Sequence, residues 1–340
     1  MNKKIEIIVN QAIGTQAERI KYRQPSGFQS NRLYDVWVNG RHLIAKEYLK
    51  PDEYLDAPRR DFNCMQRLSD LNIAPKPIFY DPNLGPLVIY EYLAGEIWPR
   101  KRPSPHMLAQ LVETWLILHA LPTDDLWLAR SMEQSAQGVA MQCEEIFQTY
   151  AAWTAVQFLP GQPCATHCLK LLPKLFDAVE KLSLLNPTLC FCQSDTRFAN
   201  ILQRPSGELA LIDWEDGGLG DPAFDLANFL VAPNEEDVLG IEEWEGLLRP
   251  YLNNRHKADP TFELRMQHYL TILTIFWLAL FLKGGMHKHQ TNTLHNWHIH
   301  DLPANHRLQR YLARAICQLN ISFQSRLAEV HNLQFFPEEF

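Results

Sequence analysis

Asp195, Asn200 and Asp213 are oxygen-bearing side chains at a spacing that can bring them together. The chain between Asn200 and Asp213 contains two short apolar runs, interpreted as strands, on either side of the turn Pro205-Ser206-Gly207. An antiparallel hairpin with this turn at its tip returns Asp213 to the neighbourhood of Asn200. Asp195 stands on the loop that enters the first strand, so the sequence predicts that all three side chains converge at the open end of one hairpin.

Two carboxylates and an amide oxygen in one small volume form a set of hard ligands. Such a set suits Mg²⁺, which usually takes one or two protein carboxylates together with phosphate and water. An Asp that orients a hydroxyl, an Asn five positions later on the metal and a second Asp on the metal also form the template of phosphoryl transfer. The alternative is a solvated acidic loop, because an Asp and an Asn at this spacing also occur together by chance.

The longer segment around these residues favours the catalytic interpretation. Residues 194–229 read SDTRFANILQRPSGELALIDWEDGGLGDPAFDLANF. This segment resembles the catalytic core of the aminoglycoside phosphotransferase and choline kinase-like family, with its His-x-Asp-x-x-x-x-Asn loop, Ile-Asp-Trp/Phe-Glu strand end and Gly-Asp-Pro-x-x-Asp-Leu-Ala turn. The resemblance implies a bilobal protein-kinase-like fold of the α+β class, with a small β-rich N-terminal lobe containing one main helix, a larger, mostly helical C-terminal lobe, and ATP in the cleft.

The resemblance also implies roles for the residues of this core. Asp195 would position the attacking hydroxyl, and Asn200 and Asp213 would ligate Mg²⁺. Arg197 stands where the family often has His. Its guanidinium would either face the transferring phosphoryl group and offset the charge that develops there, or belong to an ordinary surface residue.

Structural support for the catalytic loop is expected from Gln193 and Asp225. Gln193 stands where the family usually has a His that braces the loop, and Gln keeps both a donor and an acceptor for that purpose. By resemblance, Asp225 would accept backbone hydrogen bonds from the loop. Asp221 would cap the next helix, with Pro222 at its first position.

The N-terminal segment SGFQSNRLYDVWVNGRHLIAKEYL, residues 26–49, resembles the nucleotide-binding hairpin of the same family. By resemblance, Ser30 and Asn31 would lie over the phosphates and Lys46 would pair with them. Gly27 is the one glycine that represents the several expected in this loop.

Two further segments complete the expected nucleotide site. Asp61 stands where the family usually has Glu and would pair with Lys46, with Glu53 as the alternative partner. The segment LVIYEYLAGE resembles the hinge between the lobes, where adenine would contact the backbone of Glu91, Tyr92 and Leu93. LHALP, residues 118–122, resembles a segment early in the larger lobe of the family.

The elements that must position these residues follow from local patterns. Asn39-Gly40 suits a tight turn between two strands, a helix is expected over residues 59–72, and two more strands are expected within residues 74–93. Near residues 92–105, proline and charged residues replace the periodic apolar pattern of strands and helices. We therefore expect a nucleotide-binding lobe over 1–93 and a catalytic and substrate-binding lobe over 94–340. Helices are expected over 107–119, 132–158, 168–181, 242–251, 262–282 and 306–327.

Composition narrows the class of partner. The chain has 340 residues with 46% apolar residues and a net charge of −7, which argues against nucleic acid. The apolar run 269–282 is shorter than the ~20 residues of a membrane helix, so a buried core helix, no membrane and a cytoplasmic location are expected.

The odd number of cysteines, 7, indicates reduced thiols; a zinc site at Cys164, His167 and Cys168 is the alternative.

The sequence determines the substrate-binding residues less well than the nucleotide-binding and catalytic residues. Glu215 and Asp216 follow the metal strand and would face the substrate or be plain loop acids. Six histidines within residues 283–307 suggest a polar loop, a contact to an anionic substrate or a metal site. Trp277, Phe281 and Trp297 suggest either core packing or an aromatic box for a quaternary ammonium. A cationic substrate would suit the acids expected near the cleft, which are Glu215, Asp216, Glu242, Glu243 and Glu245.

We therefore expect a kinase that uses ATP and Mg²⁺ to phosphorylate a hydroxyl of a small, cationic molecule such as an amino sugar or amino alcohol. The alternative is a catalytically impaired pseudokinase that binds a nucleotide or a protein partner, because Gln193 replaces the usual His and the nucleotide loop is poor in glycine. A protein kinase is disfavoured, since GDPAFDLA follows Asp213 without an Ala-Pro-Glu activation segment. The oligomeric state is open.

Overall fold

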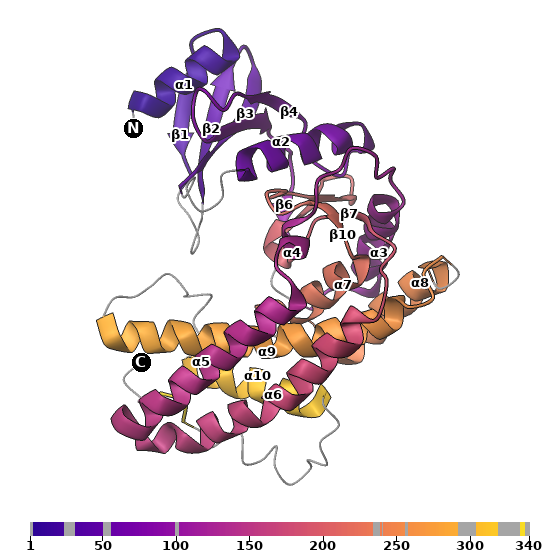
Figure 1. The fold of residues 1–340 in the computed structure, drawn as a ribbon. Coiled ribbons are helices and arrows are strands. Elements are labelled where there is room, and N and C mark those ends of the chain that lie inside the picture. The colour runs from indigo at the N-terminus through magenta and orange to yellow at the C-terminus, as the bar shows by residue number, and fades with distance from the viewer. Residues whose placement is uncertain are drawn as a thin grey trace. The chain divides into compact units, whose positions relative to one another are not determined.

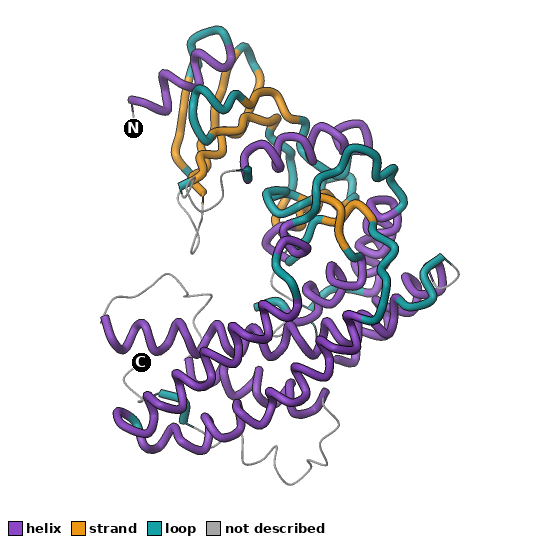
Figure 2. Tube along the Cα trace, in the orientation of Figure 1, coloured by secondary structure: helices purple, strands orange, loops and turns teal. Residues whose placement is uncertain are grey.

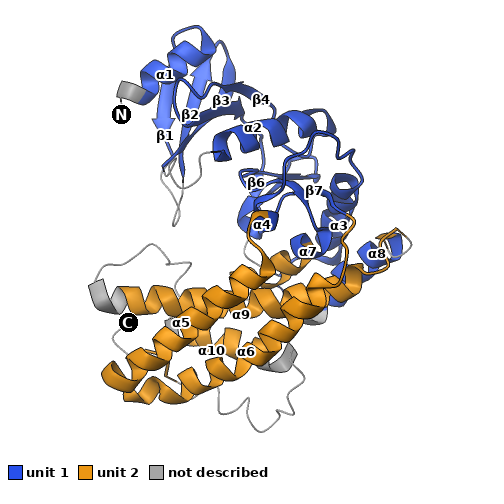
Figure 3. Cartoon of the chain, viewed as in Figure 1, with its two compact units in different colours: residues 1–132, 189–225, 238–254 blue, residues 133–188, 226–237, 255–340 orange. Residues whose placement is uncertain are grey.

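The computed structural model describes residues 3–23, 31–49, 56–98, 102–233, 239, 241–255, 258–291, 304–318 and 334–336. Antiparallel sheets dominate the N-terminal part and helices dominate the remainder, as expected for the α+β class (Figures 1 and 2). The chain forms two compact units (Figure 3). Unit 1 comprises residues 1–132, 189–225 and 238–254, and unit 2 comprises 133–188, 226–237 and 255–340. The expected lobe boundary at residue 93 lies inside unit 1 and stays a prediction.

The N-terminal sheet of unit 1 has five strands in the order β1-β2-β3-β5-β4. Its central hairpin turns at Asn39 and Gly40, whose φ angles of 50° and 71° are those of the tight turn that the sequence predicts. All neighbours in this sheet are antiparallel. The strands are β1 (Arg19–Tyr22), β2 (Asn31–Val38), β3 (Arg41–Tyr48), β4 (Pro77–Tyr80) and β5 (Leu87–Glu91).

One face of this sheet is covered by a helix that the sequence reading missed. Helix α1 (Lys3–Ile13) packs Ile5, Ile8 and Val9 against the sheet. These positions have the i, i+3, i+4 spacing of a helix face, although the sequence analysis predicts no helix over residues 3–13. Because side chains alternate along a strand, β3 turns Ala45 toward α1 and Lys46 toward the opposite face.

The catalytic segment forms a second, smaller sheet in the order β6-β8-β9. Strands β8 (Ile201–Gln203) and β9 (Leu209–Leu211) pair Ile201 with Leu211, and the strands enclose the expected turn. Asn200 lies in a short 3₁₀ turn (Phe198–Asn200) directly before β8 rather than in the strand. Strand β6 (Glu96–Ile97) pairs with β8. A two-stranded sheet of β7 (Cys190–Cys192) and β10 (Gly218–Gly220) flanks this hairpin in the sequence.

Helices carry the remaining site residues of unit 1. Asp221 caps α7 by accepting the backbone N–H of Ala223 at 2.9 Å, as expected for an N-cap followed by Pro222. Ser104 caps α3 in the same manner through the N–H of Met107. The helices are α2 (Ala57–Leu68), α3 (Pro105–His119) and α8 (Ile241–Arg255), with α4 (Arg130–Glu133) and α7 (Pro222–Val231) at the borders of the units.

Unit 2 is a helical core. The helix expected over residues 132–158 is interrupted, because the Ser135 hydroxyl accepts the N–H of Gly138 at 3.0 Å and starts a new helix there. The tripeptide Gln334–Phe336 contributes two fully buried Phe side chains to the core. The described helices are α5 (Ala136–Gln157), α6 (Gln162–Ser183), α9 (Phe262–Thr291) and α10 (Ala304–Gln318). Residues 319–327 of the expected last helix lie outside the described residues.

Helix α9 is longer than the apolar run that predicted it. Residues Phe262–His287 form the one helix of the described chain that is long and apolar enough to cross a membrane by length and composition. Buried core helices pass the same test, and α9 packs Ile275, Leu278 and Leu282 into the core of unit 2. Trp277 and Phe281 also pack against that core, whereas residues 292–303 of the histidine-rich segment, Trp297 among them, lie outside the described residues.

Candidate active site

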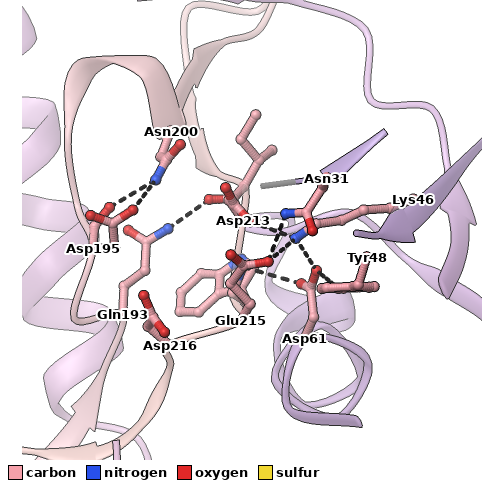
Figure 4. Close-up of polar contacts among 12 residues, drawn as sticks. Asn31, Lys46, Tyr48, Asp61, Gln193, Asp195, Asn200, Asp213, Glu215 and Asp216 are labelled. Atoms are coloured by element: carbon pink, nitrogen blue, oxygen red, sulfur yellow. Dashed lines mark hydrogen bonds and ion pairs between the residues drawn. The ribbon is translucent and has the colours of Figure 1, made fainter. Parts of the chain in front are cut away.

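Lys46 is the centre of the polar site shown in Figure 4. It lies on β3 and only 3% of its surface is exposed. Its Nζ lies 2.7 Å from Asp61, 2.5 Å from Asp213 and 2.9 Å from Glu215. Burial alone would lower the pKa of Lys46, but these three carboxylates outweigh burial and raise the pKa well above its usual value. Lys46 therefore stays a cation.

Asp61 is held rigidly on α2. Its Oδ2 accepts hydrogen bonds from Lys46 and from the Tyr48 hydroxyl, and its Oδ1 accepts the backbone N–H of Trp214 at 3.1 Å. These bonds join β3, α2 and the residue after Asp213. The shorter side chain of Asp, in a place where Glu is usual, thus still reaches Lys46. Glu53, the alternative partner, lies outside the described residues.

Asp213 follows β9 in an unusual backbone conformation. Its φ of 68° lies in the left-handed region, which Asp tolerates better than most residues. The carboxylate faces Lys46 from this turn (Figure 4). Burial would raise the pKa of Asp213, but Lys46 more than offsets it and lowers the pKa below the usual value. Asp213 is therefore an ionised ligand available to a cation.

Glu215 lies beside Lys46 as well. Its Oε2 accepts the side-chain amide of Asn31 at 2.8 Å, so the start of β2 is joined to the residues after β9. Burial raises the pKa of Glu215, and Lys46 acts in the opposite direction. The sequence left a substrate contact and a plain loop acid open for Glu215, and the structure places its carboxylate beside Lys46 and Asn31, the two residues expected to hold the nucleotide. Ser30, expected beside Asn31, lies outside the described residues.

Asp195, Asn200 and Arg197 form a second polar group. The amide nitrogen of Asn200 donates to the backbone oxygen of Asp195 at 2.8 Å and to its Oδ2 at 3.0 Å. A guanidinium nitrogen of Arg197 lies 2.7 Å from the same Oδ2. Burial raises the pKa of Asp195, while Arg197 favours its ionised form. Since the amide nitrogen of Asn200 is used by Asp195, its amide oxygen is the atom left to bind a cation.

Gln193 joins the two groups. Its amide nitrogen donates to the backbone oxygen of Ile212, directly before Asp213, at 2.7 Å. Its amide oxygen accepts the Thr196 hydroxyl at 2.8 Å. The residue therefore uses its donor toward the end of β9 and its acceptor inside the loop that carries Asp195. This arrangement explains physically how Gln can serve where His is usual.

Asp225 supports the same loop from α7. Its two carboxylate oxygens accept the backbone N–H groups of Gln193 at 3.0 Å and Ser194 at 2.8 Å. Asp225 is buried, so these bonds fix the loop in a protected environment. The expected backbone contacts are therefore present.

Asp216 and a residue that the sequence reading missed, Arg130, border the site. Arg130 Nε lies 2.8 Å from Asp216 and Nη2 lies 2.8 Å from Asp56. Burial, and then the nearby charges of Asp195 and Glu215, raise the pKa of Asp216 to about 7, although Arg130 opposes them. Arg130, at the start of α4, could not be found from the sequence, because no spacing along the chain connects it to the other site residues.

The hinge residues lie at the end of β5. The backbone N–H of Glu91 donates to Lys76 and that of Tyr92 donates to His42, at 2.8 and 3.0 Å. Both donors are therefore used by the sheet. An adenine contact from this segment would come from its carbonyl groups or from Leu93.

The residues present fit the implied cofactors. The amide oxygen of Asn200 and the ionised carboxylate of Asp213 are hard oxygen ligands of the kind that Mg²⁺ takes. Lys46 supplies a buried cation for phosphate. The carboxylates of Asp61, Asp213 and Glu215 also lie within 4.8 Å of one another, a spacing that could hold a metal ion. The predicted roles of these residues stay predictions.

Comparisons with known proteins agree with this geometry. The profile of a family described as phosphotransferase enzymes matches residues 21–264. A search of curated proteins found no match. Among solved structures, the choline kinase of Streptococcus pneumoniae is similar, with 16% identity, 93% of this chain and 99% of that chain covered, and a TM-score of 0.61.

Two other solved structures have the same fold. The ethanolamine kinase of Plasmodium vivax has 17% identity over 91% of this chain and 84% of its own, with a TM-score of 0.56. A spectinomycin phosphotransferase solved with ADP and spectinomycin has 13% identity over 96% of both chains, with a TM-score of 0.58. These likenesses confirm the bilobal, protein-kinase-like α+β fold class that the sequence predicts.

Proposed function

Since the chain belongs to the phosphotransferase enzyme family, we propose that it transfers the γ-phosphoryl group of ATP, with Mg²⁺, to a hydroxyl of a small cationic molecule. The observation that carries this proposal is the meeting of two polar groups in one site, Lys46 with Asp213 and Asp195 with Asn200 (Figure 4). The charge of Asp213 acts on Asp195, and Gln193 joins the two groups through hydrogen bonds.

The nucleotide side of the proposal rests on Lys46. Its buried ammonium would bind the α- and β-phosphates, and Asp61 would keep it directed into the site. Asn200 and Asp213 would hold Mg²⁺, which when bound would neutralise negative charge on the phosphates. Asn31 would contribute from the start of β2.

The acceptor side rests on Asp195. Its carboxylate would accept the proton of the attacking hydroxyl and hold the oxygen in line with the phosphoryl group. For this role Asp195 must be ionised, and Arg197 at 2.7 Å supports the ionised form against the effect of burial. The same guanidinium would offset negative charge in the transition state.

The proposed substrate class is a small cation with a hydroxyl group. The acidic residue Asp216 borders the catalytic loop, and a cation bound beside it would favour its ionised form. The similar structures named above are described as kinases of choline, ethanolamine and spectinomycin, which supports this class without identifying the member. No nucleic acid, membrane or protein partner is part of the proposal.

The proposal is tested by following ADP formation with amino alcohols and amino sugars as acceptors. We expect wild-type protein to consume ATP in a manner that depends on Mg²⁺ and on one class of acceptor. Asp195→Ala should lose this activity by a factor on the order of 10² to 10⁴, as expected when a general base is removed. The Asp195→Ala protein should still bind ADP, because Lys46 and Asp213 remain.

The second candidate function is a pseudokinase, and Gln193 is the observation that favours it. The experiment above separates the two. A wild-type protein that binds ATP with Mg²⁺ but turns over no acceptor, including those in a metabolite extract, would support the pseudokinase and contradict the proposal. Equal activity of wild type and Asp195→Ala would contradict the assigned role of Asp195.

A further inference from the structure

The backbone directly before Asp195 is held in a strained conformation. Ser194 has a φ of 67°, in the left-handed region that residues with a side chain rarely adopt. Such a conformation persists only where surrounding contacts impose it. The direction in which the Asp195 side chain points therefore depends on the contacts that keep Ser194 in this conformation.

Asp225 supplies hydrogen bonds that keep Ser194 in this conformation. The N–H of Ser194 donates to Oδ1 and the N–H of Gln193 donates to Oδ2, so one carboxylate fixes two successive peptide groups. Asp225 is only 1% exposed. A buried carboxylate needs a compensating partner, since leaving a charge unpaired in the interior is costly.

His119 is the partner on the other side of this carboxylate. It is the last residue of α3 and is buried. Its Nε2 lies 3.5 Å from Oδ2 of Asp225, and its Nδ1 lies 2.7 Å from the hydroxyl of Tyr251 on α8. A tyrosine hydroxyl can donate or accept, so Tyr251 suits both the neutral and the charged imidazole. In either state the Nε2 proton can be directed at Asp225.

A metal ion is the other explanation for this cluster, because ligand atoms of His119, Cys192 and Asp225 lie within 4.8 Å of one another. Both oxygens of Asp225 already accept backbone N–H groups, and Nδ1 of His119 is paired with Tyr251. Burial raises the pKa of the Cys192 thiol well above its usual value, which disfavours the thiolate that would bind a metal. The contacts favour a hydrogen-bond network.

We propose that His119 is a positioning residue for phosphoryl transfer. From the end of α3 it holds the Asp225 carboxylate, which maintains the left-handed backbone at Ser194 and thereby the direction of the Asp195 side chain. The kinetic part of this inference rests on the proposed function. The structural part, that His119 holds the loop, stands independently of it.

The kinetic test uses His119→Gln with Thr114→Val as a matched control. Thr114 is also polar and buried on α3, but its hydroxyl bonds only within the helix, to Gln110 at 2.9 Å. We expect His119→Gln to lower kcat by at least about tenfold and up to about 10², since small misplacements of a reacting group have effects of this size. The KM for ATP and the Kd for ADP should stay near wild-type values, and Thr114→Val should behave as wild type.

A second measurement does not need activity. Amide hydrogen exchange at Gln193 and Ser194 should be faster in His119→Gln than in wild type and Thr114→Val, because their acceptor is held less firmly. If the wild type catalyses no transfer, the proposed function fails while this measurement still tests His119. If His119→Gln does not fold, Tyr251→Phe, which removes the hydroxyl from Nδ1, should show the same two effects at smaller size.

Two kinds of result would overturn the inference, one in amide exchange and one in kinetics. One is unchanged exchange at both amides in the folded variant. The other is a kcat of His119→Gln equal to wild type, or a loss of kcat accompanied by an equal loss of ADP binding, which would indicate general damage to the fold.

Discussion

At the scale of single residues, the ammonium of Lys46 determines how a nucleotide would enter the site. An ammonium has three N–H donors, and three carboxylates lie within 2.9 Å of Nζ. A phosphate oxygen can bind Lys46 only if one of them moves away. Asp61 is fixed by two further hydrogen bonds, whereas the Oε2 atom of Glu215 that faces Lys46 is shared with the side chain of Asn31. Glu215 is therefore the group that we expect a phosphate to displace.

Replacing Glu215 by Gln tests this expectation. The neutral side chain no longer competes as an anion for Lys46, so ADP should bind several-fold more tightly in the absence of Mg²⁺. Isothermal titration with and without Mg²⁺ measures the effect. Glu208→Gln, an exposed acid of the same hairpin, is the control and should leave the affinity unchanged. Weaker or unchanged binding by Glu215→Gln without Mg²⁺ would show that Glu215 does not occupy the phosphate position.

Arg197 is the second residue whose contribution to catalysis can be tested by a single substitution. Loss of its charge removes the partner of Asp195, so Arg197→Met should lower kcat at saturating substrates by a factor on the order of 10², the size seen when one transition-state donor is removed. Arg204→Met removes a guanidinium from the same hairpin, where it lies 3.8 Å from Glu208, and should retain activity. Comparable kcat values for the two variants would place Arg197 among ordinary surface residues.

At the scale of elements, the segment Trp127–Ser131 connects several parts of the site. The Trp127 indole donates to Gly217 at 2.9 Å, the Ser131 hydroxyl contacts that of Ser194, and Arg130 joins Asp216 to Asp56 directly before α2. Gly218 must be glycine here, because its φ is 154° and a Cβ would meet the Trp127 oxygen at 2.6 Å. The segment thus orders the chain after Asp213.

The burial of Asp216 gives a prediction about pH. The pKa of Asp216 is raised from 3.8 to about 7, so the folded protein keeps a proton that the unfolded chain releases between these values. The free energy of unfolding should therefore fall as pH rises through this window and change no further above it. Asp216→Asn should reduce the fall, measured by urea unfolding at pH 5 and pH 8.

The control for this measurement is Asp70→Asn, which removes an exposed acid of unit 1. It should leave the difference between the two pH values as in wild type. A wild-type protein that is as stable at pH 8 as at pH 5, or an Asp216→Asn protein with the wild-type difference, would contradict the raised pKa.

At the scale of the whole molecule, unit 2 contains a large hydrophobic core. In unit 2, the Tyr150 hydroxyl donates to the backbone oxygen of Phe335 at 2.6 Å, and the rings of Tyr150 and Trp153 contact Phe336. A Cβ at Gly285 would clash with the Phe336 ring, so this glycine makes room for it on α9. The chain segment near the C-terminus is therefore an integral part of the unit 2 core.

Phe336→Ala should lower the free energy of unfolding of unit 2 by roughly 3–5 kcal/mol, the usual effect of truncating a buried Phe. Thermal or denaturant unfolding measures this loss. Below the transition, ADP binding should stay as in wild type, because the residues proposed to bind it belong to unit 1. Leu184→Ala, at a position 77% exposed in unit 2, should have little effect. A loss of stability no larger than that of Leu184→Ala would contradict the packing of Phe336.

Much of the site followed from short-range patterns in the sequence. The turn at Asn39-Gly40, the hairpin that returns Asp213 toward Asn200, and the Asp221 cap all depend on residues close together in the chain, where backbone geometry leaves few alternatives. The family motif in residues 194–229 extended these patterns to a fold class.

Only the tertiary structure decided which charges meet. Glu215 lies with Lys46 and Asn31, Arg130 lies with Asp216, and His119 lies with Asp225, although the members of each pair are far apart in the sequence. Helix α1 is a different case, since the helical spacing of Ile5, Ile8 and Val9 is present in the sequence and only the sheet that it covers was needed to show where that face packs. Spacing along the chain determines local geometry, whereas the partner of a buried charge is set by which elements pack together, and that depends on the whole fold.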